Sequence, residues 1–217
     1  MPSSEFKDPE LARGLISAIE HLAGRLEADG KGQINIMEVC GSHTMAIARN
    51  GLRSVLPDNI NLISGPGCPV CVTANRDIDS IIALTRLSNV TVATFGDMVR
   101  VPGSSTSLQQ RKAHGASVEV VYSPLDALKL AQERPGEQVV FVGVGFETTA
   151  PLVAATIERA QKQGIDNFSV ICAHKQVPPA LDVLVNDPQV RISAFLLPGH
   201  VSTILGVAPY GFLASDY

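Results

Sequence analysis

Apolar residues along this chain follow two alternating patterns, one typical of helices and one typical of buried strands. Over residues 9–29 leucines and isoleucines return every three or four positions, which predicts an amphipathic helix ended by Gly30. A short apolar run over residues 34–39 follows and predicts a strand. The two patterns then alternate through the rest of the sequence.

The later elements are predicted in the same way. Strands are expected at residues 60–63, 90–95, 118–122, 139–144, 168–172 and 192–197. Helices are expected at residues 44–50, 77–87, 105–114, 124–133, 149–163 and 179–185. Strands rich in valine and isoleucine and separated by helices predict an α/β fold, with parallel β-sheets flanked by helices.

A break in this alternation is expected within residues 123–136, where Arg134-Pro135-Gly136 interrupts the pattern. Four strands precede the break and three follow it. We therefore expect two similar lobes around a cleft, residues 1–123 and residues 124–217. A single continuous sheet is the alternative.

Composition narrows the class of protein. Charged residues make up 18% of the 217 positions and apolar residues 45%, with a mean hydropathy of +0.19, as in a well-buried globular chain. The net charge of −4 gives no basic footprint for nucleic acid. The sequence starts without an apolar leader and has no uncharged apolar run of about 18 residues, so we expect no membrane span and a cytoplasmic location.

Chemically distinctive residues stand where the predicted strands end. In parallel sheets, ligands bind at the carboxyl ends of strands, so we expect these residues to line one cleft. They are Cys40, His43, Cys68, Cys71, Asp97, Glu147, Cys172, His174 and His200.

The stretch Gly65-Pro66-Gly67-Cys68-Pro69-Val70-Cys71 carries two of the four cysteines. A Cys-x-x-Cys in a stiff loop suits a reversible dithiol or half of a metal site. The structural alternative is two small buried side chains beside a tight turn. A structural zinc site would need a second such pair, which this sequence does not contain.

A second candidate is Cys40 with His43. A thiol and an imidazole three residues apart can share a metal, and we expect the Cys40 sulfur to be reachable from the cleft. The alternative is a core cysteine beside a capping Ser42. Cys172 lies inside an apolar run and is interpreted as a buried strand residue.

Three further residues have weaker assignments. Gly143-Val-Gly145 lacks the third glycine of a dinucleotide fingerprint, so we do not infer a dinucleotide site. Glu147 is interpreted as orienting a ligand histidine, as carrying protons, or as part of a Thr-capped helix start. His200 is a candidate cleft histidine. Asp97 is either a hydrogen-bond acceptor behind the site or a helix cap.

Several long blocks together resemble the signature motifs of the HypD family of hydrogenase maturation proteins, in the family's order and over nearly the whole chain. The blocks are Met37-Glu-Val-Cys-Gly-Ser-His-Thr44, Gly65-Pro-Gly-Cys-Pro-Val-Cys-Val72, Phe95-Gly-Asp-Met-Val-Arg-Val-Pro-Gly103, Tyr122-Ser-Pro-Leu-Asp-Ala-Leu128, Gly145-Phe-Glu-Thr-Thr149 and Pro198-Gly-His-Val-Ser202.

The resemblance implies a scaffold that assembles the Fe(CN)2CO group of [NiFe]-hydrogenases, rather than a conventional turnover enzyme. It implies a HypC-type chaperone and a HypE-type cyanide donor as partners. Cys40 corresponds to the cysteine thought to hold iron together with a HypC cysteine, and Cys68 and Cys71 to the redox pair. His43, Glu147 and His200 match motif positions near that cleft.

The family also has a C-terminal part whose cysteines hold a [4Fe–4S] cluster, and none of the four cysteines here matches those ligands. We therefore expect a second lobe that is incomplete and a chain without the cluster. The functional alternative is a stand-alone thiol–disulfide oxidoreductase that uses Cys68-Pro-Val-Cys71.

Overall fold

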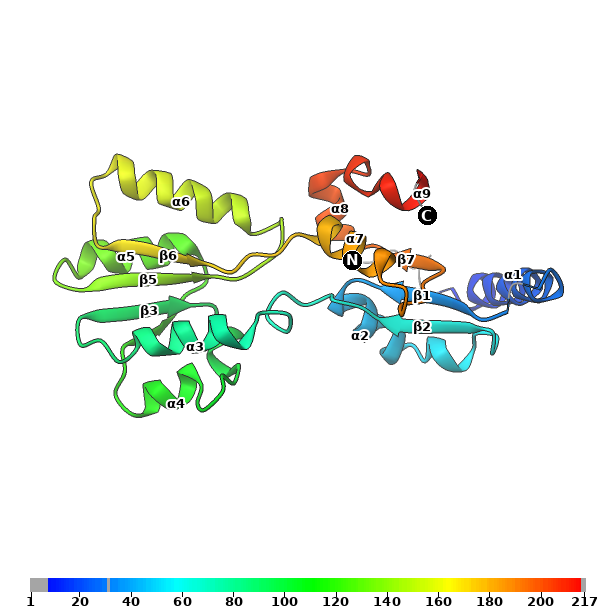
Figure 1. The fold of residues 1–217 in the computed structure, drawn as a ribbon, viewed down its shortest axis with the longest axis horizontal. Helices are drawn as coiled ribbons and strands as arrows, with labels where there is room; N and C mark the ends of the chain where they lie inside the picture. Colours follow the sequence, from blue (N-terminus) through cyan, green and yellow to red (C-terminus); the bar gives the residue numbers. More distant parts are fainter. Residues whose placement is uncertain (1–7, 31, 216–217) are drawn as a thin grey trace. The chain divides into compact units, whose positions relative to one another are not determined.

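The computed structural model describes residues 8–30 and 32–215 and divides into two compact units. Unit 1 comprises Met1–Gly67, Leu181–Ser202 and Phe212–Tyr217, and unit 2 comprises Cys68–Ala180 and Thr203–Gly211. Each unit contains its own parallel β-sheet with helices beside it (Figure 1). The predicted α/β class, with parallel sheets flanked by helices, is confirmed.

The sheet of unit 1 has three strands in the order β2-β1-β7, all parallel. They are β1 (Ile34–Glu38), β2 (Ile60–Ser64) and β7 (Ala194–Leu196). The helical segments of this part of the fold are α1 (Pro9–Ala28), α2 (Gly41–Arg49), η2 (Leu52–Ser54), α7 (Val177–Asn186), α8 (Gly199–Leu205) and α9 (Phe212–Ser215). The division between units falls inside α7 and inside α8.

Helix α1 begins where its sequence provides a cap. The Asp8 carboxylate accepts a hydrogen bond from the Glu10 backbone N–H at 2.8 Å, and Pro9 occupies the first turn. Apolar side chains of α1, of α2 and of the sheet line a cavity of about 380 Å³ in this unit. Leu11, Leu15 and Leu22 of the same helix stay more than half exposed.

The sheet of unit 2 has four parallel strands in the order β4-β3-β5-β6. They are β3 (Val90–Thr94), β4 (Val118–Val120), β5 (Gln138–Gly143) and β6 (Phe168–Cys172). The helices of this unit are α3 (Asn75–Leu84), α4 (Leu108–Ala113), α5 (Pro124–Glu133) and α6 (Ala150–Lys162), with short turns η3 (Met98–Arg100) and η4 (Ala208–Tyr210).

Helices cover both faces of this sheet. Successive side chains on a strand point to opposite faces, so each strand contributes side chains to both layers of the core. On one face Val92 and Val140 pack with Ile81 of α3. On the other face Val139 and Phe141 pack with alanines of α5 and with Val153 of α6. Strands buried on both faces explain the continuous Val-rich runs of the sequence.

The observed units differ from the predicted division at residues 123 and 124. Strands β3 and β4 precede that boundary and β5 and β6 follow it, yet all four lie in one sheet. Strand β7 instead returns from near the end of the sequence to pair with β1. Strand order along the chain cannot reveal such a return.

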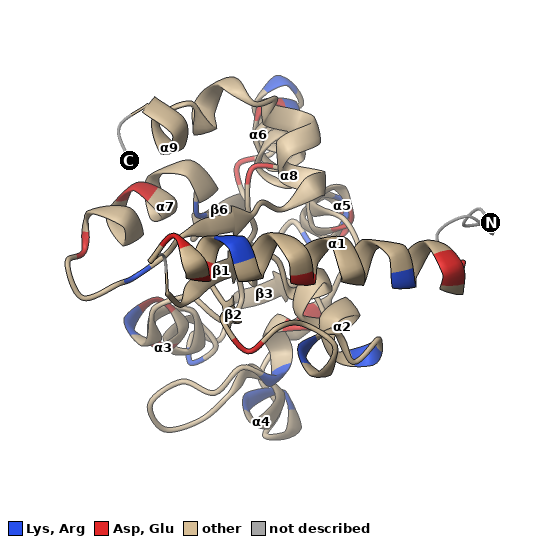
Figure 2. Cartoon of the chain, turned by 90° about the vertical axis from the view of Figure 1, so that its right-hand side faces the viewer, with Lys and Arg blue, Asp and Glu red and all other residues tan. Residues whose placement is uncertain are grey.

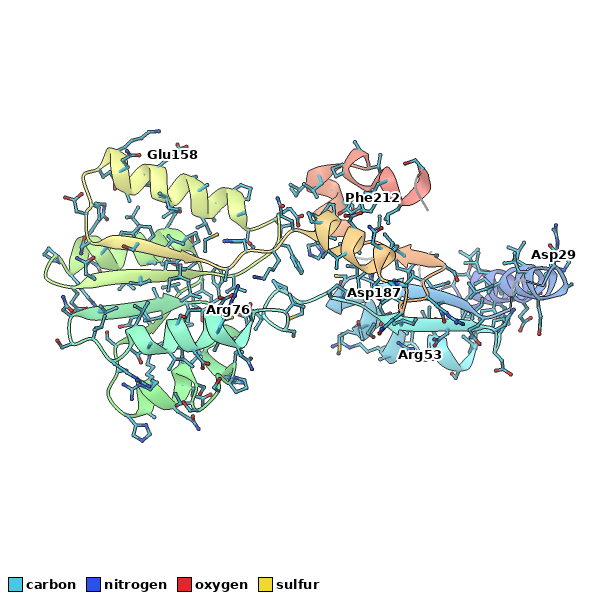
Figure 3. All side chains as sticks on the ribbon, in the orientation of Figure 1. Asp29, Arg53, Arg76, Glu158, Asp187 and Phe212 are labelled. Atoms are coloured by element: carbon cyan, nitrogen blue, oxygen red, sulfur yellow. The ribbon has the colours of Figure 1, made fainter. Side chains whose placement is uncertain are left out.

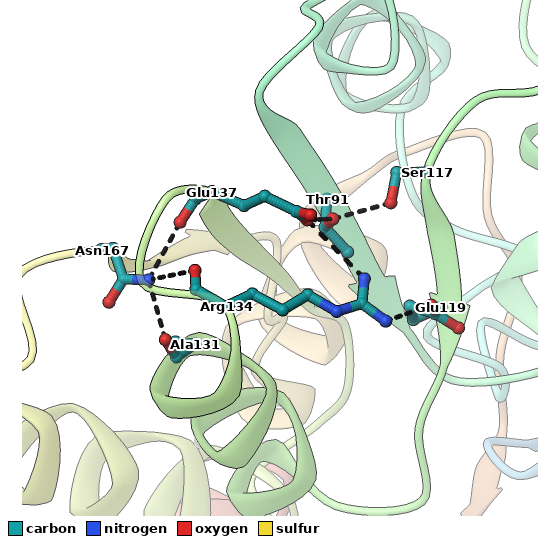
Figure 4. Close-up of polar contacts among 7 residues, drawn as sticks. All are labelled: Thr91, Ser117, Glu119, Ala131, Arg134, Glu137 and Asn167. Carbon is teal, nitrogen blue, oxygen red and sulfur yellow. Dashed lines mark hydrogen bonds and ion pairs between the residues drawn. The ribbon is translucent and has the colours of Figure 1, made fainter.

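The amino ends of the unit 2 strands are held by a polar network (Figure 4). The Asn167 side-chain amide donates to the carbonyl oxygens of Ala131, Arg134 and Glu137 at 2.8, 3.1 and 2.9 Å. The Arg134 guanidinium contacts Glu119 at 2.9 Å, and these contacts raise the pKa of Arg134. These contacts therefore hold the amino ends of the strands together. The candidate functional residues lie at the opposite, carboxyl ends.

Within the described ranges 8–30 and 32–215, the structure contains no helix that is both long and apolar enough to cross a membrane. Acidic and basic side chains are interspersed over the helices (Figure 2), in keeping with the modest net charge of −4.

Candidate functional site

Cys40 stands between β1 and α2 in unit 1. It is the N-cap residue of α2, and its carbonyl oxygen accepts the His43 backbone N–H at 2.9 Å. The side chain was expected to be reachable, but the residue is only 4% exposed. The Cys40 Sγ lies 2.9 Å from the Ser42 hydroxyl oxygen. Ser42 therefore contacts the thiol rather than capping the helix.

The imidazole that the structure brings to Cys40 belongs to His200. The Cys40 Sγ and the His200 Nδ1 are 4.0 Å apart, although 160 positions separate the two residues in the sequence. His200 lies in the first turn of α8, directly after β7, which pairs with β1. The His43 Nδ1 is buried and has no hydrogen-bond partner within the described part of the chain. Unit 1 thus provides a thiol–imidazole pair and, in His43, a second imidazole with a buried ring nitrogen.

Two glycines of the stretch at residues 65–67 let the backbone approach this cysteine. The Gly41 N–H donates to the Gly67 carbonyl oxygen at 3.2 Å, and a Cβ on Gly67 would lie 2.6 Å from the Cys40 Cα. A Cβ on Gly65 would lie 2.7 Å from the Met37 sulfur. Glycine is therefore required at positions 65 and 67, because a side chain at either position would collide with residues 37–41.

Glu38 was not singled out as a site residue, yet its side chain is fully buried, two positions before Cys40. Its Oε1 accepts the Ser64 hydroxyl at 2.6 Å and contacts the Arg53 guanidinium at 3.4 Å. Its Oε2 has no partner among the described residues. Arg53 is labelled in Figure 3 near β2. The sequence signal that could have identified Glu38 is a glutamate at the end of an apolar strand. Its hydrogen bond with Ser64 joins the carboxyl ends of β1 and β2.

Cys68 and Cys71 lie in unit 2, at the start of a turn that precedes α3. Their sulfur atoms are 2.7 Å apart, and the Cys71 backbone N–H also donates to the Cys68 Sγ at 3.3 Å. Both are thiols in this structure, as are Cys40 and Cys172. The hydrogen bond to Cys68 raises the pKa of the Cys71 thiol, with a smaller contribution from burial. The structural alternative of two buried side chains does not hold, because Cys71 is exposed and Cys68 is partly exposed.

A pocket of about 430 Å³ opens beside Cys71. The Asp97 carboxylate lies in its wall and accepts the Met98 N–H at 2.9 Å, so the helix-cap interpretation of Asp97 is confirmed. The lining residues are Val70, Cys71, Thr73, Asn75, Ile78, Asp97, Arg100, Val101 and Pro102. The exposed thiol therefore faces a recess with both apolar and charged side chains.

Glu147 follows β5 in unit 2, where its Oε1 accepts the N–H of Val177, the first residue of α7, at 2.7 Å. Its Oε2 is buried and has no partner within residues 8–30 and 32–215. Thr149 is the N-cap residue of α6, as the helix-start interpretation expected, but its side chain makes no capping hydrogen bond to that helix. Glu147 caps α7 with one oxygen and keeps the other available.

Cys172 ends β6 and is exposed, contrary to the expectation that it is buried. The physical reason is that β6 is an edge strand of its sheet. The Cys172 Sγ lies 3.4 Å from the His174 Nδ1, and burial lowers the pKa of His174. A Cβ on Gly143 would lie 2.9 Å from the His174 ring, so this glycine makes room for the imidazole.

The predicted residues are thus distributed over the two units. Unit 1 brings together Cys40, Ser42 and His200, while unit 2 brings together Cys68 and Cys71. In the described part of the sequence, no group of three or more His, Cys, Asp or Glu side chains is arranged to hold a metal ion.

The sequence comparisons agree with one another. A family model named HypD, described as "Hydrogenase formation hypA family", matches residues 10–217. The chain belongs to the HypD family. It is 48% identical over 215 residues to the hydrogenase maturation factor HypD of Rhodobacter capsulatus, covering 99% of this chain and 57% of that protein.

Two other relatives show similar coverage. Identity is 46% over 213 residues to the hydrogenase maturation factor HypD of Escherichia coli (strain K12), covering 98% of this chain and 57% of the relative. Identity is 42% over 212 residues to a putative hydrogenase expression/formation protein of Methanocaldococcus jannaschii, covering 98% of this chain and 57% of the relative. The chain therefore spans somewhat more than half the length of the HypD proteins it matches.

Proposed function

We propose that this chain is a hydrogenase maturation factor that serves as a scaffold for assembly of the Fe(CN)2CO group of [NiFe]-hydrogenase. The observation that carries the proposal is the Cys40–His200 pair, in which a buried thiol lies 4.0 Å from an imidazole nitrogen. Thiolate and imidazole are ligands that suit iron. Membership of the HypD family supports the same role.

In this proposal iron is the cargo, and Cys40 is its protein ligand together with a cysteine of a HypC-type chaperone. His43 is the second candidate ligand of this chain, and its buried Nδ1 has no hydrogen-bond partner among the described residues. His200 orients the Cys40 thiol or takes up its proton when the metal binds. A HypE-type protein supplies the cyanide ligands, in the cytoplasm.

The Cys68–Cys71 dithiol supplies two electrons to the assembly in this proposal. Its sulfur atoms are 2.7 Å apart, close enough to form a disulfide after a small movement. Glu147 is a proton carrier in the same unit, because its Oε2 is buried and is not used in capping α7.

The test is anaerobic co-purification of the protein with its small partner, followed by iron analysis and infrared spectroscopy of the cyanide and carbonyl bands. We expect Cys40→Ala to lose the iron and the bands. The matched control is Cys172→Ala, an exposed cysteine of the other unit, which should retain both. Bands that survive Cys40→Ala unchanged would contradict the scaffold role.

The alternative, a stand-alone thiol–disulfide oxidoreductase, draws on the exposed Cys71 beside its pocket. It requires that the chain reduces insulin disulfides at the same rate with and without Cys40. No insulin reduction by the wild-type chain would remove this alternative, and the scaffold proposal would stand.

A further inference from the structure

The two sulfur atoms of the dithiol have unequal surroundings. The Cys68 Sγ accepts two hydrogen bonds, from the Cys71 backbone N–H at 3.3 Å and from the Cys71 thiol at 2.7 Å. Cys71 is the more exposed of the two residues and is one of those that line the pocket of about 430 Å³. One sulfur therefore accepts a backbone hydrogen bond, and the other is better placed for contact with a second molecule.

This inequality matters when the pair is a disulfide. Thiol–disulfide exchange is fastest when the incoming thiolate reaches an accessible sulfur and the departing sulfur is a stable thiolate. Cys71 meets the first condition by its exposure, and Cys68 meets the second because the Cys71 N–H donates to its sulfur.

We propose that a peptide thiol carrying a carboxylate reduces the Cys68–Cys71 disulfide from this pocket, attacking the Cys71 Sγ and releasing Cys68 as the thiolate. The proposal rests on the redox role proposed above and extends it, since a dithiol that has donated its electrons must be reduced again.

The pocket provides the recognition. Arg100 lies in its wall, is exposed, and makes no ion pair or side-chain hydrogen bond within the described residues. Its guanidinium is thus available to a carboxylate of the incoming peptide. The Asp97 carboxylate in the same wall suits an ammonium group, and Val70 and Val101 provide apolar contacts. Glutathione combines a thiol, two carboxylates and an ammonium group in one small peptide.

The exchange balances in two steps. The first glutathione thiolate forms a bond to the Cys71 Sγ, the Cys68–Cys71 bond breaks, and Cys68 takes up a proton. A second glutathione thiolate then attacks the glutathione sulfur of the mixed disulfide, and Cys71 leaves and is protonated. Two glutathione thiols lose two electrons and become glutathione disulfide, while the protein disulfide becomes a dithiol.

The first experiment locates the mixed disulfide. The full chain, with Cys172→Ala to remove another exposed thiol, is oxidised with diamide, mixed with glutathione, quenched with acid, and analysed by fragment mass spectrometry. We expect glutathione on Cys71. In addition, Cys68→Ser treated with glutathione disulfide should accumulate the adduct on Cys71, because the resolving sulfur is missing.

The second experiment tests recognition by Arg100. We expect Arg100→Gln to slow reduction of the disulfide by glutathione roughly three- to tenfold, and to leave reduction by the neutral 2-mercaptoethanol unchanged. Arg100→Lys should restore most of the rate. The matched control is Arg86→Gln, an exposed arginine beyond the opposite end of α3, which should have no effect.

An adduct found on Cys68, or equally on both cysteines, would overturn the proposal. So would failure of the wild-type chain to form the internal disulfide, or an equal effect of Arg100→Gln on both thiols. None of these results would affect the iron and infrared test of Cys40, so failure of this inference is distinguishable from failure of the scaffold role.

Discussion

Gly67 lies against the backbone of Cys40, so close that a Cβ on Gly67 would stand 2.6 Å from the Cys40 backbone nitrogen. The two residues belong to different motifs of the sequence and meet because β1 and β2 are parallel neighbours with aligned carboxyl ends. The position of the Cys40 thiol thus depends on a residue without a side chain.

Replacing this glycine should disturb the cysteine. We expect Gly67→Ala to lower the free energy of unfolding by about 1–3 kcal/mol, because the methyl group overlaps backbone atoms. Under the scaffold role proposed above, it should also reduce the iron that co-purifies with the protein and its small partner. Urea unfolding and iron analysis measure the two effects. Gly24→Ala is the control, since a Cβ on Gly24 meets no atom within 4 Å and alanine favours the helix. Equal behaviour of both variants would contradict the prediction.

The buried Glu38 side chain gives a second prediction. Ser64→Ala removes the 2.6 Å hydrogen bond to the Glu38 Oε1 and leaves that oxygen with only the Arg53 contact. We expect a loss of about 1–3 kcal/mol in the free energy of unfolding. Ser54→Ala removes a hydrogen bond to a backbone carbonyl at an exposed residue and should cost less than about 0.5 kcal/mol. Chemical denaturation of both variants measures the difference, and a similar cost for the two would refute it.

His174 predicts a pH dependence of stability. Burial lowers its pKa below the ordinary histidine value of 6.5, so the unfolded chain binds a proton at a higher pH than the folded chain does. Stability should therefore fall as the pH drops below about 6.5, down to the lowered pKa of the folded state. His174→Gln should reduce this fall, whereas His114→Gln, at an exposed position, should not. The measurement is the urea midpoint between pH 7.5 and pH 5, and identical slopes in wild type and His174→Gln would contradict the assignment.

The network at the amino end of the unit 2 sheet should affect stability without affecting the dithiol. Asn167→Ala leaves three carbonyl oxygens without their side-chain donor and should cost about 1–3 kcal/mol. The rate of disulfide reduction by glutathione should stay unchanged, because the dithiol precedes α3 and lies outside this network. Asn89→Ala, at an exposed position before β3, is the matched control. A changed reduction rate in folded Asn167→Ala would show that the two regions are coupled.

Local patterns predicted the local elements closely. The helix expected at residues 9–29 is α1 (Pro9–Ala28), and the strand expected at 168–172 is β6 (Phe168–Cys172). Helix α8 was not predicted, because Pro198 and Gly199 at its start are typical of a loop. The burial of Cys172 was misjudged since edge and central strands have similar apolar runs.

Long-range relationships were harder to predict from residues. The motifs identified Cys40, His43 and His200 as candidates, but nothing in the spacing indicated that His200 is the imidazole beside the Cys40 sulfur. That contact depends on β7 pairing with β1, and pairing across so many residues leaves no local signal. Glu38 was missed for a related reason, because its partners Arg53 and Ser64 come from a different segment.

The return of β7 to β1 also sets the order in which the two sheets can be completed during synthesis. Asn35 and Ser193 are hydrogen-bonded neighbours 158 positions apart, whereas all four strands of unit 2 lie between them in the sequence. Unit 2 can therefore fold while β1 and β2 still lack their third strand, because short-range contacts form before contacts that close long loops. The thiol–imidazole pair of Cys40 and His200 can form only after β7 has paired with β1, so a nascent chain has its dithiol before it has this pair.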